Sequence, residues 1–386
     1  MSALRSRFLS DSAIREIAET HRAPVLALDC EVVRQQYADL QQALPEVGFY
    51  YAIKCFPNTD IVRTLNALGA GFDVATSGEI EMLRELHINP RACIHTHPIK
   101  SRRDIHDALR FGCTTFVVDN RDELLKFRSF GHRVGLILRV GFRSADAKVD
   151  LSRKFGCTPE EAPQLLALAR DLGIRVKGLS FHVGSQSAKP DTHVAAIQRC
   201  VAIMREEHAQ GGDMNLLDIG GGFPVSYLEP VPHIVEYCKP IREALKAIPE
   251  GTEVIAEPGR FLVAPAAMSI AKVIGKARRD GRWWYYLDDG VYGCYSGLIY
   301  DHAQYPIRSL KQGPTIDCTL VGPTCDSIDV VAESIQLPEL EIGDVVVGEV
   351  MGAYTAATAT DFNSLPRSEI LVLNAPEQAE AVMYIA

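Results

Sequence analysis

A lysine follows a stretch of the chain that has the composition of a buried strand. Residues Phe49–Ile53 are aromatic, small or β-branched, and Lys54 follows them shortly before the turn residues Pro57 and Asn58. Burial would remove water from the Lys54 ammonium group, lower its pKa and free the lone pair that forms a Schiff base with a carbonyl compound. A lysine that reaches solvent or pairs with a carboxylate is the competing interpretation.

Further polar residues stand where later apolar stretches end. Asp73 lies within one such stretch, Arg139 and His182 end two others, and Ser185 follows closely. Each residue alone has an ordinary structural explanation, and His182 could be a hydrogen-bonded core histidine. The recurrence of this placement along the chain favours a shared site.

Two glycine-containing turns complete the set. Gly220-Gly221-Gly222 follows one apolar stretch, and Glu257-Pro258-Gly259-Arg260 follows the next. A backbone without Cβ atoms can approach a phosphate closely, and Ser185 and Arg260 would add a hydroxyl group and a charge. Glu257 could pair with a protonated ring nitrogen, or else form a salt bridge with Arg260. A Schiff-base lysine, a phosphate cradle and a carboxylate for a pyridine nitrogen together indicate pyridoxal phosphate.

The spacing of the apolar stretches predicts the elements that position these residues. Strands are expected to start near Phe49, Gly71, Ala92, Thr114, Arg133, Lys177, Leu216 and Glu253. Helical patterns lie between them, most clearly at 61–68, 79–86, 104–111 and 160–172. Alternating strands and helices over about 210 residues predict an α/β fold with a closed (β/α)8 barrel, whose chemistry lies at the C-terminal ends of the strands. An open doubly wound sheet is the alternative, but no GxGxxG motif follows the first strand.

The alternation ends near Arg260, and a β-rich part follows. Segments 283–287, 315–321, 344–347 and 370–373 have strand composition and are separated by Gly, Pro and Asp turns. At the other end of the chain we expect a helix within 1–21, a strand at 24–29 and a helix at 31–44.

Composition limits the class of protein. The 386 residues are 47% hydrophobic and 23% charged with a net charge of −9, which favours a soluble globular protein and argues against nucleic-acid binding. Ten cysteines without a CxxC pair suit a reducing compartment. Because no signal-peptide core or membrane-length apolar run is present, we expect a cytoplasmic protein without a membrane partner. No metal site is expected, since His95 and His97 lack a third ligand.

In order along the chain, the motifs resemble those of the eukaryotic-type ornithine/lysine decarboxylases, fold-type III pyridoxal-phosphate enzymes related in architecture to alanine racemase. The resemblance covers about Val25 to Asn363 and rests on YAIKC at 51–55, SFHVGS at 180–185, DIGGGFP at 218–224, EPGR at 257–260, DGVYG at 289–293, YDH at 300–302, GPTCD at 322–326 and MGAYT at 351–355. It implies an alanine-racemase-like barrel at 30–265 and a second, C-terminal β domain formed by 1–29 and 266–386, which the Val25 strand joins.

The resemblance also implies the roles of individual residues. Lys54 would carry the cofactor covalently, His182 would stack on its ring and Glu257 would pair with its nitrogen. The cofactor phosphate would be held by Ser185, Gly222, Gly259, Arg260 and Tyr354, and the rest of the cofactor site would include Asp73, Arg139 and Pro258. The distal ammonium group of the substrate would be bound by Tyr300, Asp301 and Asp326. Cys325 would return a proton to Cα after CO2 leaves. Because Cys325 and Asp326 would reach the site from the other subunit, a homodimer with shared active sites is implied.

The implied activity is pyridoxal-phosphate-dependent decarboxylation of a diamino acid, with L-ornithine giving putrescine and CO2 in polyamine biosynthesis. Lysine or another diamino acid stays open because one methylene changes binding by only about 1–3 kcal/mol. The run Cys325-Asp326-Ser327-Ile328-Asp329 departs from the pattern of diaminopimelate decarboxylases, and Glu257 argues against alanine racemases, which place arginine at the ring nitrogen. A non-catalytic homologue that binds an inhibitor protein is an alternative of another class, and the retained Lys54, Glu257, Arg260 and Cys325 speak against it.

Overall fold

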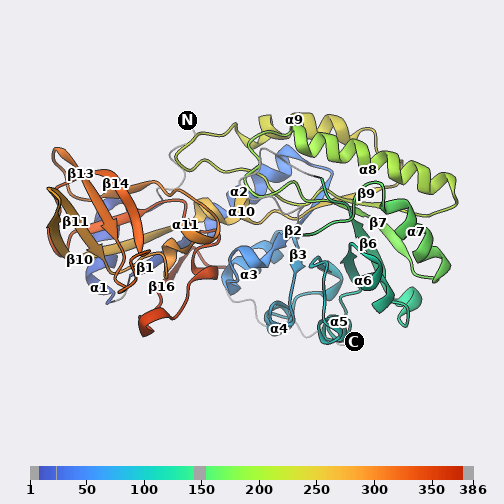
Figure 1. The fold of residues 1–386 in the computed structure, drawn as a ribbon, viewed down its shortest axis with the longest axis horizontal. Coiled ribbons are helices and arrows are strands. Elements are labelled where there is room, and N and C mark those ends of the chain that lie inside the picture. Colours follow the sequence, from blue (N-terminus) through green and yellow to red (C-terminus); the bar gives the residue numbers. More distant parts are fainter. Residues whose placement is uncertain (1–7, 23, 143–153, 377–386) are drawn as a thin grey trace. The chain divides into compact units, whose positions relative to one another are not determined.

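The computed structural model describes residues 8–22, 24–142 and 154–376, and its contacts divide the chain into two units (Figure 1). The barrel unit comprises Gln36–Pro224 and Val231–Gly259. The sheet unit comprises the residues up to Gln35, Val225–Pro230 and Arg260–Pro376.

In the described part of the barrel unit, eight parallel strands pair in chain order, and the last closes on the first. They are β2 (Val47–Ala52), β3 (Gly71–Val74), β4 (Cys93–His95), β5 (Thr115–Val118), β6 (Gly135–Arg139), β7 (Val176–Ser180), β8 (Leu216–Asp218) and β9 (Glu253–Ala256). Each starts within two residues of its predicted position. The predicted (β/α)8 barrel is confirmed.

Helices precede or connect the barrel strands. They are α2 (Cys30–Ala43), α3 (Thr59–Ala67), α4 (Ser77–Glu85), α5 (Arg102–Phe111), α6 (Arg121–Lys126), α7 (Ala162–Asp171), α8 (Asp191–Ala209) and α9 (Ile234–Leu245), and α8 and α9 lie side by side (Figure 1). Local sequence fixes several of their ends. Thr76 and Ser101 cap α4 and α5 through reciprocal hydrogen bonds with Glu79 and Asp104, and Gly112 ends α5 in the left-handed conformation that glycine favours.

A layer of branched apolar side chains fills the barrel. Ile94, Val117, Ile137, Leu216 and Ile255 come from different strands and pack together, each at most 4% exposed. Because a close-packed interior resists deformation, this layer fixes the strands that carry the polar residues at their C-terminal ends.

The sheet unit is built from strands that the chain contributes at both of its ends. They are β1 (Val25–Asp29), β10 (Ala267–Arg279), β11 (Arg282–Leu287), β12 (Ile307–Ser309), β13 (Thr315–Val321), β14 (Val330–Pro338), β15 (Val345–Gly348) and β16 (Glu369–Leu373). The order is β12-β15-β10-β11-β13-β14, and β1 pairs antiparallel with β10 and parallel with β16. The helices of this unit are α1 (Asp11–Thr20), α10 (Arg260–Val263) and α11 (Gly297–Tyr300).

The sheet contains more strands than the sequence predicted. β1, β11, β13, β15 and β16 match expected segments, whereas β10, β12 and β14 were not expected. β10 is rich in Ala, Lys and Arg, which have low strand propensity, and it forms because its first half pairs with β1 and β15. Its Met268 and Ile270 join Ile14, Val25 and Val347 in the core of this unit.

Among the described residues, no helix is both long enough and apolar enough to cross a bilayer.

Candidate active site

The polar residues predicted from the barrel segments gather at the C-terminal ends of the strands. Lys54 follows β2, Asp73 lies in β3 and Arg139 is the last residue of β6. His182 follows β7, and Glu257 follows β9. Electrostatic interactions link them, since Lys54 and Asp73 act on Glu257 while Lys54 and Arg139 act on His182. The structure therefore brings these five residues together.

Lys54 differs from the buried strand lysine that its neighbours predicted. β2 ends at Ala52, and Lys54 lies in a short 3-10 turn with its side chain 44% exposed. Its Nζ donates to Oδ2 of Asp73 at 2.7 Å, while Oδ1 of the fully buried Asp73 accepts a hydrogen bond from the Thr96 hydroxyl group. The structure thus agrees with the competing interpretation, in which the lysine pairs with a carboxylate. The amine is accessible to a carbonyl compound and is held in place by Asp73.

Glu257 lies against a second buried carboxyl group, Asp218, which sequence reasoning did not identify. Asp218 ends β8, and its Oδ1 accepts a hydrogen bond from the Gly220 N–H at 2.8 Å. Burial raises the pKa of Asp218 to about 6, and burial together with Asp218 and Asp73 raises the pKa of Glu257 well above its usual value. The two neighbouring carboxyl groups therefore favour the protonated form of Glu257. The sequence feature that could have identified Asp218 was its position at the end of a strand.

His182 is neutral. Its pKa is well below the ordinary histidine value because of desolvation and the positive charges of Arg139 and Lys54. Nδ1 accepts a hydrogen bond from the Gly184 N–H at 3.0 Å, which places the ring proton on Nε2. The guanidinium group of Arg139 lies 5.5 Å from the ring centroid of Phe155. The neutral imidazole of His182 and the cation of Arg139 therefore lie at the C-terminal ends of β7 and β6.

The turn Gly220-Gly221-Gly222 adopts a backbone that requires glycine. Gly222 has φ +95°, and a Cβ atom there would lie 2.4 Å from the Gly184 carbonyl oxygen. Within the described residues, the N–H groups of Gly221 and Gly222 donate no hydrogen bond, and neither does that of Gly259. Gly259 itself packs against Ala52 and Cys55, close to Lys54 in the chain. Unpaired N–H groups in a turn without Cβ atoms are what a phosphate cradle requires.

The residues of the barrel unit thus have the chemical groups needed to bind pyridoxal phosphate. The unit offers a primary amine for the aldehyde group, an acid pair for the pyridine nitrogen in which burial favours the protonated form of Glu257, and unpaired N–H donors for the phosphate. Ser185 is half-buried in the loop after β7, directly after Gly184.

In the sheet unit, Arg260 and Asp301 form a buried ion pair. Nη2 of Arg260 lies 2.7 and 2.6 Å from the two carboxylate oxygens of Asp301. Arg260 also donates to the Tyr227 hydroxyl group at 2.8 Å and lies 5.0 Å from the ring centroid of Tyr354. Tyr300, the neighbour of Asp301, is 59% exposed. The residues predicted for the phosphate and for the substrate ammonium group are therefore in direct contact in this unit.

Cys325 and Asp326 lie in a loop of the same unit. Cys325 is exposed, and its N–H donates to Oδ1 of Asn363 at 3.2 Å. Asp326 accepts hydrogen bonds from the Tyr292 hydroxyl group at 2.5 Å and from the Ile328 N–H at 3.2 Å. These bonds lower the pKa of Asp326. The hydrogen bond between Tyr292 and Asp326 also raises the pKa of Tyr292 to about 12. Asp326 is therefore an anion at neutral pH, held by a tyrosine that sequence reasoning did not single out.

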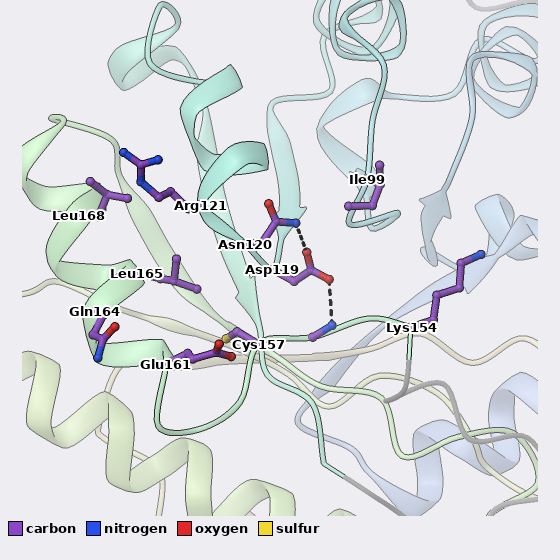
Figure 2. A pocket seen from close by; sticks show the side chains of 11 residues that line it. Ile99, Asp119, Asn120, Arg121, Lys154, Cys157, Glu161, Gln164, Leu165 and Leu168 are labelled. Carbon is purple, nitrogen blue, oxygen red and sulfur yellow. Dashed lines mark hydrogen bonds between the residues drawn. The ribbon is translucent and has the colours of Figure 1, made fainter.

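A separate cavity of about 560 Å³ lies beside the ends of β5 and β6 in the barrel unit (Figure 2). Asp119 accepts hydrogen bonds there from Nδ2 of Asn120 at 2.7 Å and from the Gly156 N–H at 2.8 Å (Figure 2). Its described lining contains none of the predicted site residues. No cluster of His, Cys, Asp and Glu in the described residues could hold a metal ion.

Comparison with known proteins agrees with this chemistry. Residues 30–264 match the family model of the pyridoxal-dependent decarboxylases, pyridoxal binding domain. The lysine/ornithine decarboxylase of Selenomonas ruminantium is 34% identical over 373 residues, which span 96% of this chain and 95% of its own length. The ornithine decarboxylase of Schizosaccharomyces pombe is 35% identical, over 90% of this chain and 82% of its own.

Solved structures extend the similarity to three dimensions. The lysine/ornithine decarboxylase of Vibrio vulnificus complexed with cadaverine is 50% identical, covers 94% of this chain and 98% of its own, and superposes with a TM-score of 0.90. The complex of the Vibrio vulnificus enzyme with putrescine gives 49% identity and a TM-score of 0.91, over 95% and 99% of the two chains. Family, fold and site agree: the chain belongs to the fold-type III ornithine/lysine decarboxylases and is a pyridoxal-phosphate-dependent amino-acid decarboxylase.

Proposed function

We propose that the enzyme converts L-ornithine to putrescine and CO2 in polyamine biosynthesis and accepts lysine as a slower substrate. The observation that carries the choice of a diamino acid is the ionised carboxylate of Asp326, held by Tyr292 next to Cys325. A distal ammonium group that loses its hydration needs an anionic partner, which Asp326 supplies. That the related Vibrio vulnificus enzyme has been solved with both cadaverine and putrescine supports two substrates that differ by one methylene.

The proposed roles follow the chemistry of each group. When bound, pyridoxal phosphate supplies an electron sink for the negative charge that CO2 leaves on Cα. Lys54 holds the cofactor and releases the amine, and Glu257 gives its proton to the ring nitrogen. Cys325 delivers a proton to Cα. The phosphate is held by Ser185, Gly222, Gly259, Arg260 and Tyr354, and the ring and its surroundings by Asp73, Arg139, His182 and Pro258. Tyr300 and Asp301 assist Asp326 with the substrate.

The active form in this proposal is a cytoplasmic homodimer in which Cys325 and Asp326 complete the site of the partner subunit. The exposure of Cys325, and of Ile328 and Phe362 at 52% and 40%, supports an apolar contact surface around this loop. We place the barrel domain at 30–265 and assign 1–29 and 266–386 to the β domain.

A substrate panel tests the proposal directly. Released CO2 is measured with the cofactor-loaded protein and ornithine, lysine, arginine or diaminopimelate at equal concentrations. We expect ornithine to give the highest kcat/KM, with lysine lower by about 10- to 200-fold, the range that one methylene supplies. A preference for diaminopimelate or arginine would overturn the substrate assignment. Absence of turnover with all four would favour the non-catalytic alternative.

The contribution of Asp326 is tested with the same panel. Asp326→Asn keeps the shape of the side chain and removes its charge, so kcat/KM for ornithine and lysine should both fall by about 100-fold, as expected for a desolvated ion pair. Asp317→Asn, on β13 of the same unit and 36% exposed, serves as the control and should leave both constants unchanged.

A further inference from the structure

His193 is a buried histidine that the proposed reaction does not use. It lies in the first turn of α8 and is 0% exposed. The rings of Phe181, Phe223 and Tyr237 surround it, with centroids 6.2, 5.4 and 6.3 Å from its own. Its Nε2 lies 3.1 Å from the carbonyl oxygen of Gly221. A polar ring in apolar surroundings is costly to bury, and this hydrogen bond is what compensates it.

The contact fixes the tautomer of His193. A carbonyl oxygen only accepts hydrogen bonds, so Nε2 must carry the ring proton and donate it. Nδ1 is buried without a hydrogen-bond partner among the described residues, which disfavours a second proton there. Burial lowers the pKa of His193 to about 4, so the ring stays neutral throughout the physiological range.

The contact also sets the direction of the peptide group between Gly221 and Gly222. In a trans peptide the C=O and N–H bonds point in opposite directions. Because the Gly221 oxygen points toward His193, the Gly222 N–H points away from it. This N–H is one of the donors that find no acceptor among the described residues. A flip of this peptide would instead direct a carbonyl oxygen to that side, where it would repel an anion.

A second contact holds the neighbouring loop. The Tyr237 hydroxyl group shares its one proton between the carbonyl oxygens of Ser187 and Lys189, at 3.0 and 3.2 Å. The Ser187 N–H donates to the Gly222 oxygen at 3.0 Å. The peptide groups on both sides of Gly222 are thereby fixed. Without such contacts a glycine turn would rotate readily, since glycine has the least restricted backbone.

We propose that His193 is a positioning residue of the phosphate cradle, which locks the Gly221–Gly222 peptide so that the Gly222 N–H remains available to the cofactor phosphate. This inference rests on the proposed placement of the phosphate at the glycine turn.

The test compares two ligands that differ only in the phosphate. His193→Phe keeps an aromatic ring and removes the N–H donor. The full-length protein is stripped of cofactor with hydroxylamine and titrated with pyridoxal phosphate and with pyridoxal, and binding is followed by absorbance. The Kd for pyridoxal phosphate should rise about five- to tenfold, the effect of losing one buried hydrogen bond, while the Kd for pyridoxal stays within about twofold. His193→Gln, which restores an N–H donor, should recover part of the loss.

His208 provides a matched control on the same helix. Its Nε2 lies 2.6 Å from the Met214 carbonyl oxygen, before β8 rather than after it. His208→Phe should change neither Kd. If His193→Phe weakens pyridoxal as much as pyridoxal phosphate, or weakens neither, the inference is wrong. Should His193→Phe not fold, His193→Met removes the donor with a more adaptable side chain and is read in the same way.

The same titration separates this inference from the one on which it rests. Gly222→Ala should weaken pyridoxal phosphate more than pyridoxal if the phosphate binds at the glycine turn. If Gly222→Ala has no such selective effect, the phosphate placement fails. If Gly222→Ala is selective and His193→Phe is not, the placement stands and the role of His193 fails alone.

Discussion

At the scale of single residues, protonation states decide what the barrel rim can do. Burial beside Asp218 raises the pKa of Glu257 and favours its protonated form, whereas desolvation and the charges of Arg139 and Lys54 lower the pKa of His182 and keep it neutral. A proton on Glu257 suits a ring nitrogen that must become protonated, and a neutral imidazole suits stacking on that ring. Burying this acid pair lowers the stability of the cofactor-free protein, so its effect can be measured as a change in the free energy of unfolding.

Replacing Glu257 by glutamine should change how stability depends on pH. Because the pKa of Glu257 is raised by folding, the folded state keeps a proton that the unfolded chain loses near pH 4.3. The stability that this proton contributes is present below that pH and is lost as pH rises through the raised pKa. Glu257→Gln has no proton to lose. In cofactor-free protein, its free energy of unfolding relative to wild type should therefore increase as pH rises above about 4.3, by about 1.4 kcal/mol for each pH unit up to the raised pKa.

Urea denaturation at several pH values measures this effect. Glu253→Gln is the control, because Glu253 is an exposed residue at the start of β9, the strand that Glu257 follows. A difference between Glu257→Gln and wild type that does not vary with pH would mean that the pair holds no such proton.

Cys325→Ala should alter the products rather than stop the release of CO2. Without the thiol, the proton that follows decarboxylation reaches the cofactor carbon instead of Cα, and aldehyde and pyridoxamine phosphate form in place of the amine. Chromatography of the products after single turnovers measures the ratio. Cys318→Ala, which removes a buried thiol from β13, should keep the wild-type ratio. A wild-type product ratio in Cys325→Ala would remove this residue from the proposed role.

At the scale of elements, the site at the C-terminal ends of the barrel strands depends on turns that few sequences can form. Gly222 combines φ +95° with a backbone oxygen 2.4 Å from the position of a Cβ atom. Gly211, just after α8, has φ +87° but nothing within 4 Å of such an atom. The two glycines share their backbone conformation and differ in crowding, so they form a matched pair.

Alanine at these two positions should separate backbone strain from close contact. Gly211→Ala meets only the strain of a left-handed residue and should lose about 1 kcal/mol in the free energy of unfolding. Gly222→Ala must also displace the Gly184 carbonyl group and should lose at least about 2 kcal/mol more. Urea denaturation compares them. Equal losses in the free energy of unfolding would mean that the turn at Gly222 adjusts to the added Cβ atom. The close contact with the Gly184 carbonyl group would then not constrain the turn.

How far the sequence predicted these elements depends on whether their signal is local. The starts of the barrel strands were predicted to within two residues because apolar runs alternate with helical patterns. β10 was missed because its pairing with β1 joins Leu28 to Ala267, segments far apart in the chain. The exposure of Lys54 agrees with the competing interpretation rather than with a buried strand lysine, because β2 ends at Ala52 and Lys54 lies in the 3-10 turn that follows. Asp218 was missed although it obeys the strand-end rule that identified Glu257.

At the scale of the whole molecule, the predicted site residues are divided between the two units. Lys54, Asp73, Glu257 and the glycine turn belong to the barrel unit, whereas Arg260, Tyr354, Asp301, Cys325 and Asp326 belong to the sheet unit. The proposed dimer gives this division a function, because one subunit would contribute the barrel and the other would contribute Cys325 and Asp326.

Mixing two defective variants tests the shared site. Lys54→Ala and Cys325→Ala each damage every site in their own homodimers. After subunit exchange, half of the dimers are mixed, and each mixed dimer carries one intact site if the site is shared. Amine formation should therefore recover to about a quarter of the wild-type rate. Recovery should not occur if both residues act within one chain, and sedimentation should confirm that the mixed species is a dimer.

The central claim is that Lys54 carries the cofactor. Borohydride reduction of the cofactor-loaded protein, followed by proteolysis and mass spectrometry, tests it most directly. We predict that the visible absorbance band is bleached and that the phosphopyridoxyl group is found on Lys54. Its appearance on another lysine would contradict the account, and the most informative rival is Lys100, which is 2% exposed and has a pKa lowered to about 8 by burial.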